Sequence, residues 1–267
     1  MDKIRVLVSG ICGRMGKLVA EGVRTAPDTL LVAGVDPVGA GSDLAEVIGG
    51  RRSGMAIDGE LGSAIVRSQP NVMVDFTAPA VVMDNLREAL SRRVACVVGT
   101  TGLTQENLNE VAALCDRNDA PALIAPSFSV GAVLMMRFAA EAATRYEYAQ
   151  VLEMHHPGKK DAPSGTAMLT ARRIAEAKGE AMRLPQPEHV SLPGVMGGEL
   201  SGIGVHAMRM EGFVADQRVV FGGAGETLTI EHRTTGRECF VPGVLLAVRK
   251  VVHQEGLVVG LENLLWP

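Results

Sequence analysis

The sequence predicts an α/β protein with two sheets, a parallel one in a larger domain and an open mixed one in a smaller α+β domain. Two observations support this prediction. Strand and helix patterns alternate through the first half of the chain, which is typical of a parallel sheet with crossover helices. After Val130 the pattern changes to a long apolar helix followed by alternating strands, which indicates a second sheet of different construction.

The composition fits such a fold. Hydrophobic residues make up 47% of the 267 positions but aromatic residues only 3%, so the core must consist mainly of Ala, Val, Leu, Ile and Met. That composition is common in α/β proteins whose parallel strands are buried on both faces. A chain of this length suits one large domain or two modest ones.

The first predicted strand, Ile4 to Ser9, leads into a turn with Gly10, Gly13 and Gly16 and then into a helical periodicity. This order places helix N-terminal N–H groups where they can bind a pyrophosphate, as in Rossmann-type dinucleotide-binding domains. The spacing is G-x-x-G-x-x-G with Cys12 at the second glycine of the strict fingerprint. The prediction therefore depends more on the order of strand, turn and helix than on the motif. Cys12 could be an activated thiol, but we favour a small residue that fits a crowded turn.

A second strand is predicted from Leu30 to Val35 and ends in Asp36, about 20 residues after the last glycine, where an acidic side chain can bind ribose hydroxyls. Pro37 and Val38 follow, so no neighbouring arginine is available for a 2′-phosphate, which the carboxylate would also repel. We therefore expect NADH to be favoured over NADPH. Arg14 at the helix start could still bind a phosphate, so use of both cofactors stays open.

Three more strands are predicted in the first half, at residues 72–75, 95–98 and 122–125, with helices over 81–90 and within 108–115. Each strand ends in turn-forming residues: Asp75-Phe76-Thr77, Gly99-Thr100-Thr101-Gly102 and Ala125-Pro126-Ser127-Phe128-Ser129. Because open parallel sheets bind ligands at the carboxyl ends of their strands, we expect these loops to face the cofactor. Each one alone is also compatible with an ordinary turn.

The second half has a different order of elements. Helices are predicted over 133–143 and 166–177, strands over 148–152, 204–210, 218–221 and 227–232, an exposed connection or flap over 179–200, and a last helix over 244–252 that could return to the first domain. We therefore assign residues 1–126 and 241–267 to a dinucleotide-binding domain and residues 127–240 to a substrate-binding and oligomerisation domain.

The segment Glu153 to Ala167, E-M-H-H-P-G-K-K-D-A-P-S-G-T-A, leaves a predicted strand and enters a predicted helix. Histidine titrates near neutral pH and lysine can donate a proton. The backbone N–H groups of Ser-Gly-Thr at a helix start can bind an anion. The segment therefore predicts an anion-binding site with proton donors beside it.

Simpler interpretations exist for these residues taken singly. His155 and His156 could be structural histidines, and Lys159 and Lys160 could be surface charges. A metal site is a poor interpretation, because adjacent side chains of an extended segment point in opposite directions and no further ligands follow at a recognisable spacing.

Three residues further along the chain could line the same site: His206, His232 and Arg233. Strand alternation, however, places His232 on one face with Leu228 and Ile230, so a core position is at least as good an interpretation.

Charge and cysteine content exclude several classes of protein. A net charge of -4 and a sequence pI near 5.9 give no basic excess, so nucleic acid is not an expected partner. The four cysteines lack C-x-x-C or disulfide-like spacing, which favours a reducing compartment. The chain starts with a strand pattern instead of a secretory signal and contains no apolar stretch of membrane-span length, so we expect a soluble cytoplasmic protein with no membrane partner.

Five motifs resemble those of one enzyme family: V-S-G-I-C-G-R-M-G, V-D-F-T, V-V-G-T-T-G, A-P-S-F-S-V-G-A and H-H-P-G-K-K-D-A-P-S-G-T-A. They span nearly the whole chain, and the last is highly specific whereas the first is not. The chain resembles the 4-hydroxy-tetrahydrodipicolinate reductase family, also called dihydrodipicolinate reductases, of the diaminopimelate route to lysine. The resemblance implies that a nicotinamide hydride from NADH or NADPH reduces the ring of a small cyclic dicarboxylate at C4 to yield tetrahydrodipicolinate.

The resemblance also implies roles for single residues. His155 would be the general acid/base and Lys159 the proton donor, while His156, Gly165 and Thr166 would bind the substrate carboxylate. The cofactor contacts that it implies are Gly10, Ile11, Cys12, Gly13, Arg14, Met15, Asp36, Gly99, Thr100, Thr101, Ala125, Pro126, Ser127 and Phe128. Such enzymes are typically homotetramers built through the sheet of the substrate domain, so we expect a homotetramer.

Two positions depart from the family pattern. Ser127 stands where the family often has Asn, beside the nicotinamide loop. Residues 206–217 contain M-R-M-E-G-F-V-A-D-Q where many members have a glycine-acid turn and a histidine, which could alter tetramer packing or strand edges.

Two other functions are compatible with parts of the sequence. Another two-domain amino-acid dehydrogenase, acting on an imine or a semialdehyde, would lack the combination of H-H-x-x-K and S-G-T. A nonenzymatic NADH-sensing regulator would need a DNA-binding or partner-binding module, and the sequence shows no basic helix-turn-helix pattern.

Overall fold

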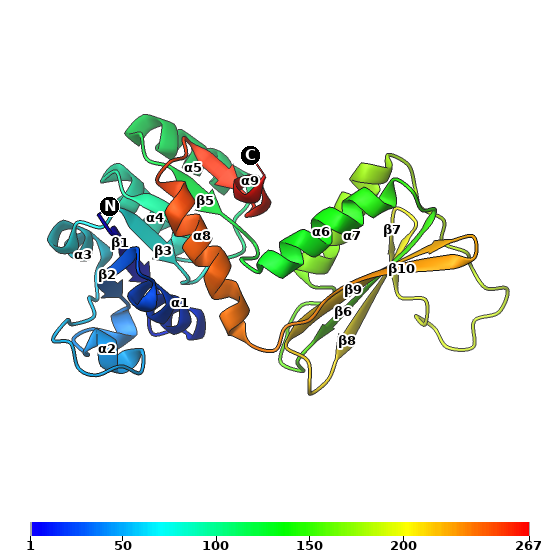
Figure 1. Ribbon diagram of the computed structural model, residues 1–267, viewed down its shortest axis with the longest axis horizontal. Helices are drawn as coiled ribbons and strands as arrows, with labels where there is room; N and C mark the ends of the chain where they lie inside the picture. The colour runs from blue at the N-terminus through cyan, green and yellow to red at the C-terminus, as the bar shows by residue number, and fades with distance from the viewer. Residues whose placement is uncertain (1, 267) are drawn as a thin grey trace. The chain divides into compact units, whose positions relative to one another are not determined.

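The computed structural model describes residues 2–266, and the chain divides into two compact units (Figure 1). Unit 1 comprises the residues up to Ser129 together with those from Phe240 onward, and unit 2 runs from Val130 to Cys239. Each unit has its own sheet and its own helices. Within residues 2–266, no helix combines the length and the apolar character that crossing a membrane requires.

Unit 1 is built on a six-stranded parallel sheet in the order β11-β5-β4-β3-β1-β2. The strands are β1 (Ile4–Ser9), β2 (Thr29–Val35), β3 (Val72–Asp75), β4 (Ala95–Val98), β5 (Ala122–Ile124) and β11 (Leu257–Val259). Val6, Leu7 and Val8 are all fully buried although successive side chains of a strand point to opposite faces, so both faces of this sheet are covered. The parallel α/β domain is confirmed.

Helices cover both faces of this sheet. Those of unit 1 are α1 (Arg14–Thr25), α2 (Leu44–Val47), α3 (Leu61–Ser68), α4 (Val82–Ser91), α5 (Gln105–Asn118), α8 (Val241–Val251) and α9 (Glu262–Leu265). Leu7 and Met73 pack in one core cluster with residues of α3, α4 and α5. Helix α1 contacts α8, which brings the end of the chain back against the first helix.

Several short elements of unit 1 were not predicted. Helix α2 has four residues and is capped by Asp43, whose carboxylate accepts the N–H groups of Ala45 and Glu46. Strand β11 has three residues and pairs with β5 at the edge of the sheet. Elements this short lack the length over which a hydrophobic period can be recognised.

Unit 2 contains a five-stranded mixed sheet in the order β10-β9-β6-β8-β7, with β6 and β8 parallel and the other pairs antiparallel. Its strands are β6 (Tyr148–His155), β7 (Gly198–Leu200), β8 (Ile203–Arg209), β9 (Ala215–Gly223) and β10 (Glu226–His232), and its helices are α6 (Val130–Ala143) and α7 (Gly165–Lys178). Helices α6 and α7 pack against each other, α7 against β6 and β8, and α6 against β9 and β10. The second, mixed sheet is therefore also confirmed.

The connection predicted over residues 179–200 needs one correction. Residues 180–197 form no helix or strand and are largely exposed, as expected. Gly198–Leu200, however, is the edge strand β7, which pairs antiparallel with β8. Its three residues include Gly198 and show no strand pattern, so the pairing depends on the neighbouring strand.

The register of unit 2 determines which side chains meet. Glu153 pairs with Gln217 of β9, and His155 pairs with Arg209 of β8. Gln217 donates a hydrogen bond to Thr170 of α7, so these side chains lie on the face that the helices cover. Because side chains alternate along a strand, Glu153 and His155 are on this same face.

Candidate active site

The turn between β1 and α1 is tightly packed. Gly10 has φ +79°, and a Cβ there would lie 2.5 Å from the carbonyl oxygen of Phe76. A Cβ at Gly16 would lie 2.0 Å from the carbonyl oxygen of Gly10. Helix α1 starts after Gly13, which has no side chain to cap it, so its first N–H groups suit an anionic ligand.

Asp36 follows β2 and is fixed beside this turn. Its carboxylate accepts the backbone N–H of Cys12 at 3.0 Å and that of Val38 at 3.0 Å. Cys12 itself is half-buried, and a Cβ at Gly39 would lie 2.3 Å from its sulfur. Burial raises the pKa of the Cys12 thiol, and Asp36 raises it further, so the structure favours the interpretation of Cys12 as a small packing residue over an activated thiol.

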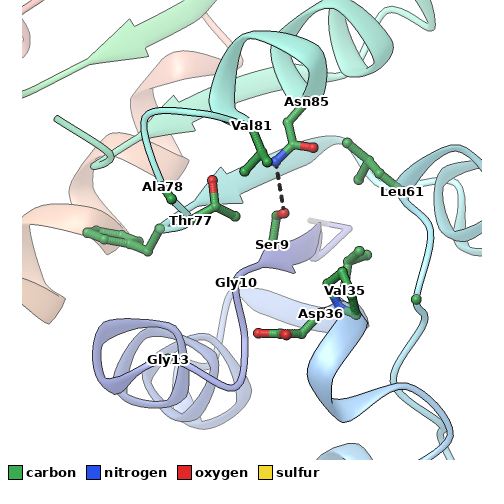
Figure 2. A pocket seen from close by; sticks show the side chains of 13 residues that line it. Ser9, Gly10, Gly13, Val35, Asp36, Leu61, Thr77, Ala78, Val81 and Asn85 are labelled. Atoms are coloured by element: carbon green, nitrogen blue, oxygen red, sulfur yellow. Dashed lines mark hydrogen bonds between the residues drawn. The ribbon is translucent and has the colours of Figure 1, made fainter. Parts of the chain in front are cut away.

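A pocket of about 470 Å³ opens beside the glycine turn, with Gly10 at the end of β1 and Asp36 at the end of β2 (Figure 2). Its walls are mainly apolar and backbone groups. The lining residues are Ser9, Gly10, Gly13, Val35, Asp36, Pro37, Gly59, Leu61, Phe76, Thr77, Ala78, Val81 and Asn85. Among these described residues, Asp36 carries the only formal charge. The pocket therefore suits a ligand in which a largely apolar ring is joined to a group that can hydrogen-bond the Asp36 carboxylate.

A second pocket of unit 1, about 180 Å³, lies near the ends of β4 and β5. It is lined by Met15, Phe76, Gly99, Pro126, Ser127, Phe128 and Phe240. The rings of Phe76 and Phe128 lie 5.9 Å apart, centroid to centroid, at an interplanar angle of 57°. Phe76 lines both pockets and therefore links them.

The predicted cofactor residues fall into two groups. Gly10, Gly13 and Asp36 line the larger pocket, and Met15, Gly99, Pro126, Ser127 and Phe128 line the smaller one. Ile11 and Ala125 have buried side chains, Cys12 is packed in the turn, and Arg14 and Thr101 are exposed. Ser127 stands where the family often has Asn, and its hydroxyl oxygen accepts the N–H of Ser129 at 3.3 Å.

Thr100 has an internal partner. It is buried, and its hydroxyl donates to Asp75 at 2.7 Å. Asp75 is fully buried and also accepts from the Thr77 hydroxyl and from Asn85. The acid thus holds the loops after β3 and β4 together, and only the backbone of Thr100 remains to meet a ligand.

Some pocket residues were not predicted. Leu61 and Val81 stand at the start of α3 and just before α4, and Phe240 returns from the end of the chain. Apolar residues at helix starts carry no sequence signal that separates pocket walls from core. The D-F-T turn, which was expected to face the cofactor, does contribute Phe76 and Thr77.

In unit 2 the predicted anion site is the N-terminus of α7. The hydroxyl of Ser164 accepts the N–H of Ala167 at 3.1 Å and caps the helix. Gly165 is exposed, and a Cβ there would meet nothing within 4 Å. Open space therefore adjoins Gly165 at the start of a 14-residue helix, the end at which a helix attracts anions.

The proton-carrying residues precede this helix start in the chain. His155 is the last residue of β6, and its side chain is 14% exposed. Burial lowers the pKa of His155, with Glu153 opposing that effect, so the ring is neutral near pH 7. The Lys159 ammonium donates to Asp161 at 2.7 Å, and its backbone N–H donates to the carbonyl oxygen of His156.

Two residues of this site were missed as site residues. Glu153 is fully buried and accepts hydrogen bonds from His155, Arg209 and the N–H of Ser164. Burial alone would raise the pKa of Glu153, but the hydrogen bonds from Arg209 and His155 outweigh it and hold that pKa below its usual value. Arg209 reaches Glu153 from a different strand, so it can be identified only when the register of β6 and β8 is known.

The three other candidates of the second half lie elsewhere. His206 pairs with Leu152, which places it on the face opposite His155, and its ring hydrogen-bonds Gln150 at 2.7 Å. His232 lies on the helix-covered face beside Gly131 of α6, on the same side as Leu228 and Ile230. Arg233 is exposed and lies 3.8 Å from Asp216.

Comparison with known proteins decides the family. A family model described as "Dihydrodipicolinate reductase, N-terminus" matches residues 4–128, and one described as "Dihydrodipicolinate reductase, C-terminus" matches residues 131–265. The chain belongs to the dihydrodipicolinate reductase family. Membership makes it a pyridine-nucleotide-dependent oxidoreductase of the diaminopimelate route to lysine.

Relatives agree over the full length. The 4-hydroxy-tetrahydrodipicolinate reductase of Moorella thermoacetica is 44% identical over 262 residues, which is 98% of each chain. The dipicolinate-bound dihydrodipicolinate reductase of Paenisporosarcina sp. TG-14 is 36% identical with a TM-score of 0.87, covering 98% of this chain and 99% of that one. An amine dehydrogenase of Mycobacterium smegmatis, 15% identical with a TM-score of 0.68 over 96% of this chain and 94% of its own, shares the fold alone.

Proposed function

We propose that this dihydrodipicolinate reductase reduces 4-hydroxy-tetrahydrodipicolinate to tetrahydrodipicolinate with NADH or NADPH. The observation that carries the proposal is the start of α7, where open space at Gly165 follows a segment with His155, His156 and Lys159. A cyclic dicarboxylate offers the anion that such a helix start binds, and its reduction requires a proton.

The cofactor would be held by unit 1. Three features fit a dinucleotide with a free ribose diol. They are the glycine turn, in which a Cβ would clash with the backbone, the apolar pocket and the carboxylate of Asp36. When bound, the nicotinamide supplies the hydride. We propose that NADH is preferred, because a 2′-phosphate would meet Asp36 in a pocket whose described lining offers no cation.

The substrate carboxylate would be bound by the N–H groups of Gly165 and Thr166 together with the ring of His156. Charge-assisted hydrogen bonds of this kind are stronger than neutral ones. Lys159 would donate the proton that accompanies hydride transfer, and His155 would act as the general acid/base.

The assay is the oxidation of reduced nicotinamide, followed by absorbance, with the substrate made in place from pyruvate and aspartate semialdehyde by its synthase. We expect rapid oxidation, faster with NADH at equal subsaturating concentrations, and competitive inhibition by dipicolinate. A folded protein that binds NADH but oxidises neither cofactor under these conditions would contradict the proposal and would favour another dehydrogenase or a sensor.

We also propose that the protein is a cytoplasmic homotetramer assembled through the sheet of unit 2. Helices α6 and α7 cover one face of that sheet, while Tyr148 and Met208, on the opposite face, are 38% and 44% exposed. Sedimentation analysis should give about four times the monomer mass of 28.1 kDa. A monomer at micromolar concentration would contradict this assembly.

A further inference from the structure

The buried carboxylate of Glu153 has four hydrogen bonds. Arg209 donates to both of its oxygens, at 2.7 and 2.8 Å, in a bidentate pair. The N–H of Ser164, the N-cap of α7, donates at 3.1 Å. The remaining bond joins Nδ1 of His155 to Oε2 at 2.5 Å.

The sheet, rather than a loop, sets this geometry. Glu153 and His155 are alternate residues of β6 and therefore share a face. Arg209 pairs in register with His155 on the parallel strand β8 and reaches back to Glu153. Three side chains on two hydrogen-bonded strands thus occupy fixed positions, which is the kind of support that a catalytic group needs.

Arg209 also holds the segment that carries the second proton donor. Its guanidinium donates to the carbonyl oxygen of Asp161 at 2.7 Å, and the carboxylate of Asp161 accepts from the Lys159 ammonium at 2.7 Å. One arginine therefore connects the partner of His155 with the partner of Lys159.

A purely structural ion pair would not need the histidine. The bidentate contact with Arg209 already neutralises Glu153, so the bond to His155 adds little to the satisfaction of the buried charge. That bond does occupy Nδ1, which leaves Nε2 as the nitrogen that can exchange a proton.

We propose that Glu153, itself held by Arg209, is a positioning residue that accepts the Nδ1–H of His155 and thereby directs Nε2 toward the substrate. The catalytic role of His155 in this statement rests on the function proposed above. When Nε2 takes up a proton, the carboxylate also stabilises the resulting imidazolium without being protonated itself.

The charged groups that act on His155 give opposite directions for two variants. Burial lowers the pKa of His155, Glu153 raises it, and Lys159 and Arg209 lower it. Glu153→Gln should therefore lower the pKa of His155 further, whereas Arg209→Met should raise it. Loss of packing alone would not shift the pKa of His155 in opposite directions in these two variants.

The test is ¹⁵N NMR of the histidine rings in the full-length protein without substrate, with His155 assigned by the loss of its signal in His155→Gln. We expect the wild type to carry the proton on Nδ1 at neutral pH, and Glu153→Gln to lose that preference. A wild-type ring with its proton on Nε2 would overturn the proposal, and this result requires no variant to fold.

Kinetics provides the second readout. Glu153→Gln should lower kcat by about 10²-fold, the lower end of what positioned proton transfer contributes, with little change in KM or NADH affinity. Glu231→Gln is the matched control, since Glu231 also pairs with an arginine on a neighbouring strand of the same sheet, at 2.9 Å from Arg218, but has no histidine partner in this pair. Equal kcat values for Glu153→Gln and the wild type, with both folded, would overturn the proposal.

The two proposals fail separately. If the wild type does not oxidise nicotinamide with the named substrate but its His155 ring shows the Nδ1 tautomer that depends on Glu153, then the proposed function fails and the positioning role stands. If the wild type is active and the ring is unchanged in Glu153→Gln, the positioning role fails alone.

Discussion

Asp36 is the side chain on which cofactor choice should depend. Two backbone N–H groups hold its carboxylate at the glycine turn, where the ribose of the adenosine is proposed to lie. Asp36→Ala should weaken NADH binding by about 10- to 100-fold, because hydrogen bonds to a charged group contribute about 1.5–3 kcal/mol. NADPH affinity should stay the same or increase, since a like charge is removed. Titration by nicotinamide fluorescence measures both values.

The matched control is Asp28→Ala, at the opposite end of the same strand. Asp28 is exposed and pairs with Arg249 at 2.7 Å, away from the pocket lining. Its removal should leave both affinities unchanged. Equal weakening of NADH and NADPH by Asp36→Ala would show that the acid does not select the cofactor.

Lys159 is expected to matter for turnover and not for the cofactor. Lys159→Ala removes the proposed proton donor, so kcat should fall by about 10²- to 10⁴-fold while NADH affinity stays within twofold. Lys160→Ala, an exposed neighbour of the same charge, should leave turnover unchanged. Unchanged kcat in Lys159→Ala would remove this lysine from the mechanism.

How much of the site could be predicted depended on distance along the chain. His155, His156, Lys159 and the Ser-Gly-Thr turn are close in sequence, so their clustering was visible there. Arg209 lies 56 residues from Glu153 and meets it only through the register of β6 and β8. The same register moved His206 to the opposite face, because a side chain one position along a strand points the other way.

At the level of elements, the start of α7 offers the most direct test of the anion site. Gly165→Ala should place a methyl group in the open space beside the first N–H groups without touching the protein. We expect KM for the substrate to rise about tenfold, while the thermal midpoint stays the same or rises, since Ala is the better helix former. Steady-state kinetics and calorimetry on the same preparation give both values.

The same change at Gly16 provides the contrast. A Cβ there would lie 2.0 Å from a backbone oxygen, so Gly16→Ala should lower the thermal midpoint and weaken cofactor binding together. An unchanged KM in Gly165→Ala would indicate that the substrate carboxylate binds elsewhere.

The elements that were predicted correctly have long, regular patterns. Strands β1, β3 and β4 match their predicted bounds, and α5 and α7 extend the predicted helices by a few residues at most at either end. Strand β7 and helix α2 were missed because their three or four residues depend on a neighbouring strand or on one capping acid. Local sequence carries little information about such partners.

For the whole molecule, stability should fall as the medium becomes acidic. Burial lowers the pKa of both His155 and His232 below the value of an unfolded histidine, about 6.5. Below pH 6.5 the unfolded chain therefore binds more protons than the folded one, so the free energy of unfolding decreases as the pH falls. Urea unfolding at pH 7.5, 6.5 and 5.5 measures this decrease.

His232→Asn identifies the contribution of the second histidine. This variant should show a smaller decrease in the free energy of unfolding between pH 7.5 and 5.5 than the wild type. A wild-type value that is constant over this range, or that increases toward acid, would contradict the assigned directions of the two pKa shifts.

Helix α8 and strand β11 come from the last part of the chain but belong to unit 1. Val244, Val248 and Val251 are buried there, and β11 completes the sheet beside β5. During synthesis, all residues of unit 2 are added to the chain before these pieces of unit 1. The nascent chain therefore leaves its first sheet unfinished until β11 has been added, and a product released before that point exposes the apolar surface that chaperones and proteases recognise.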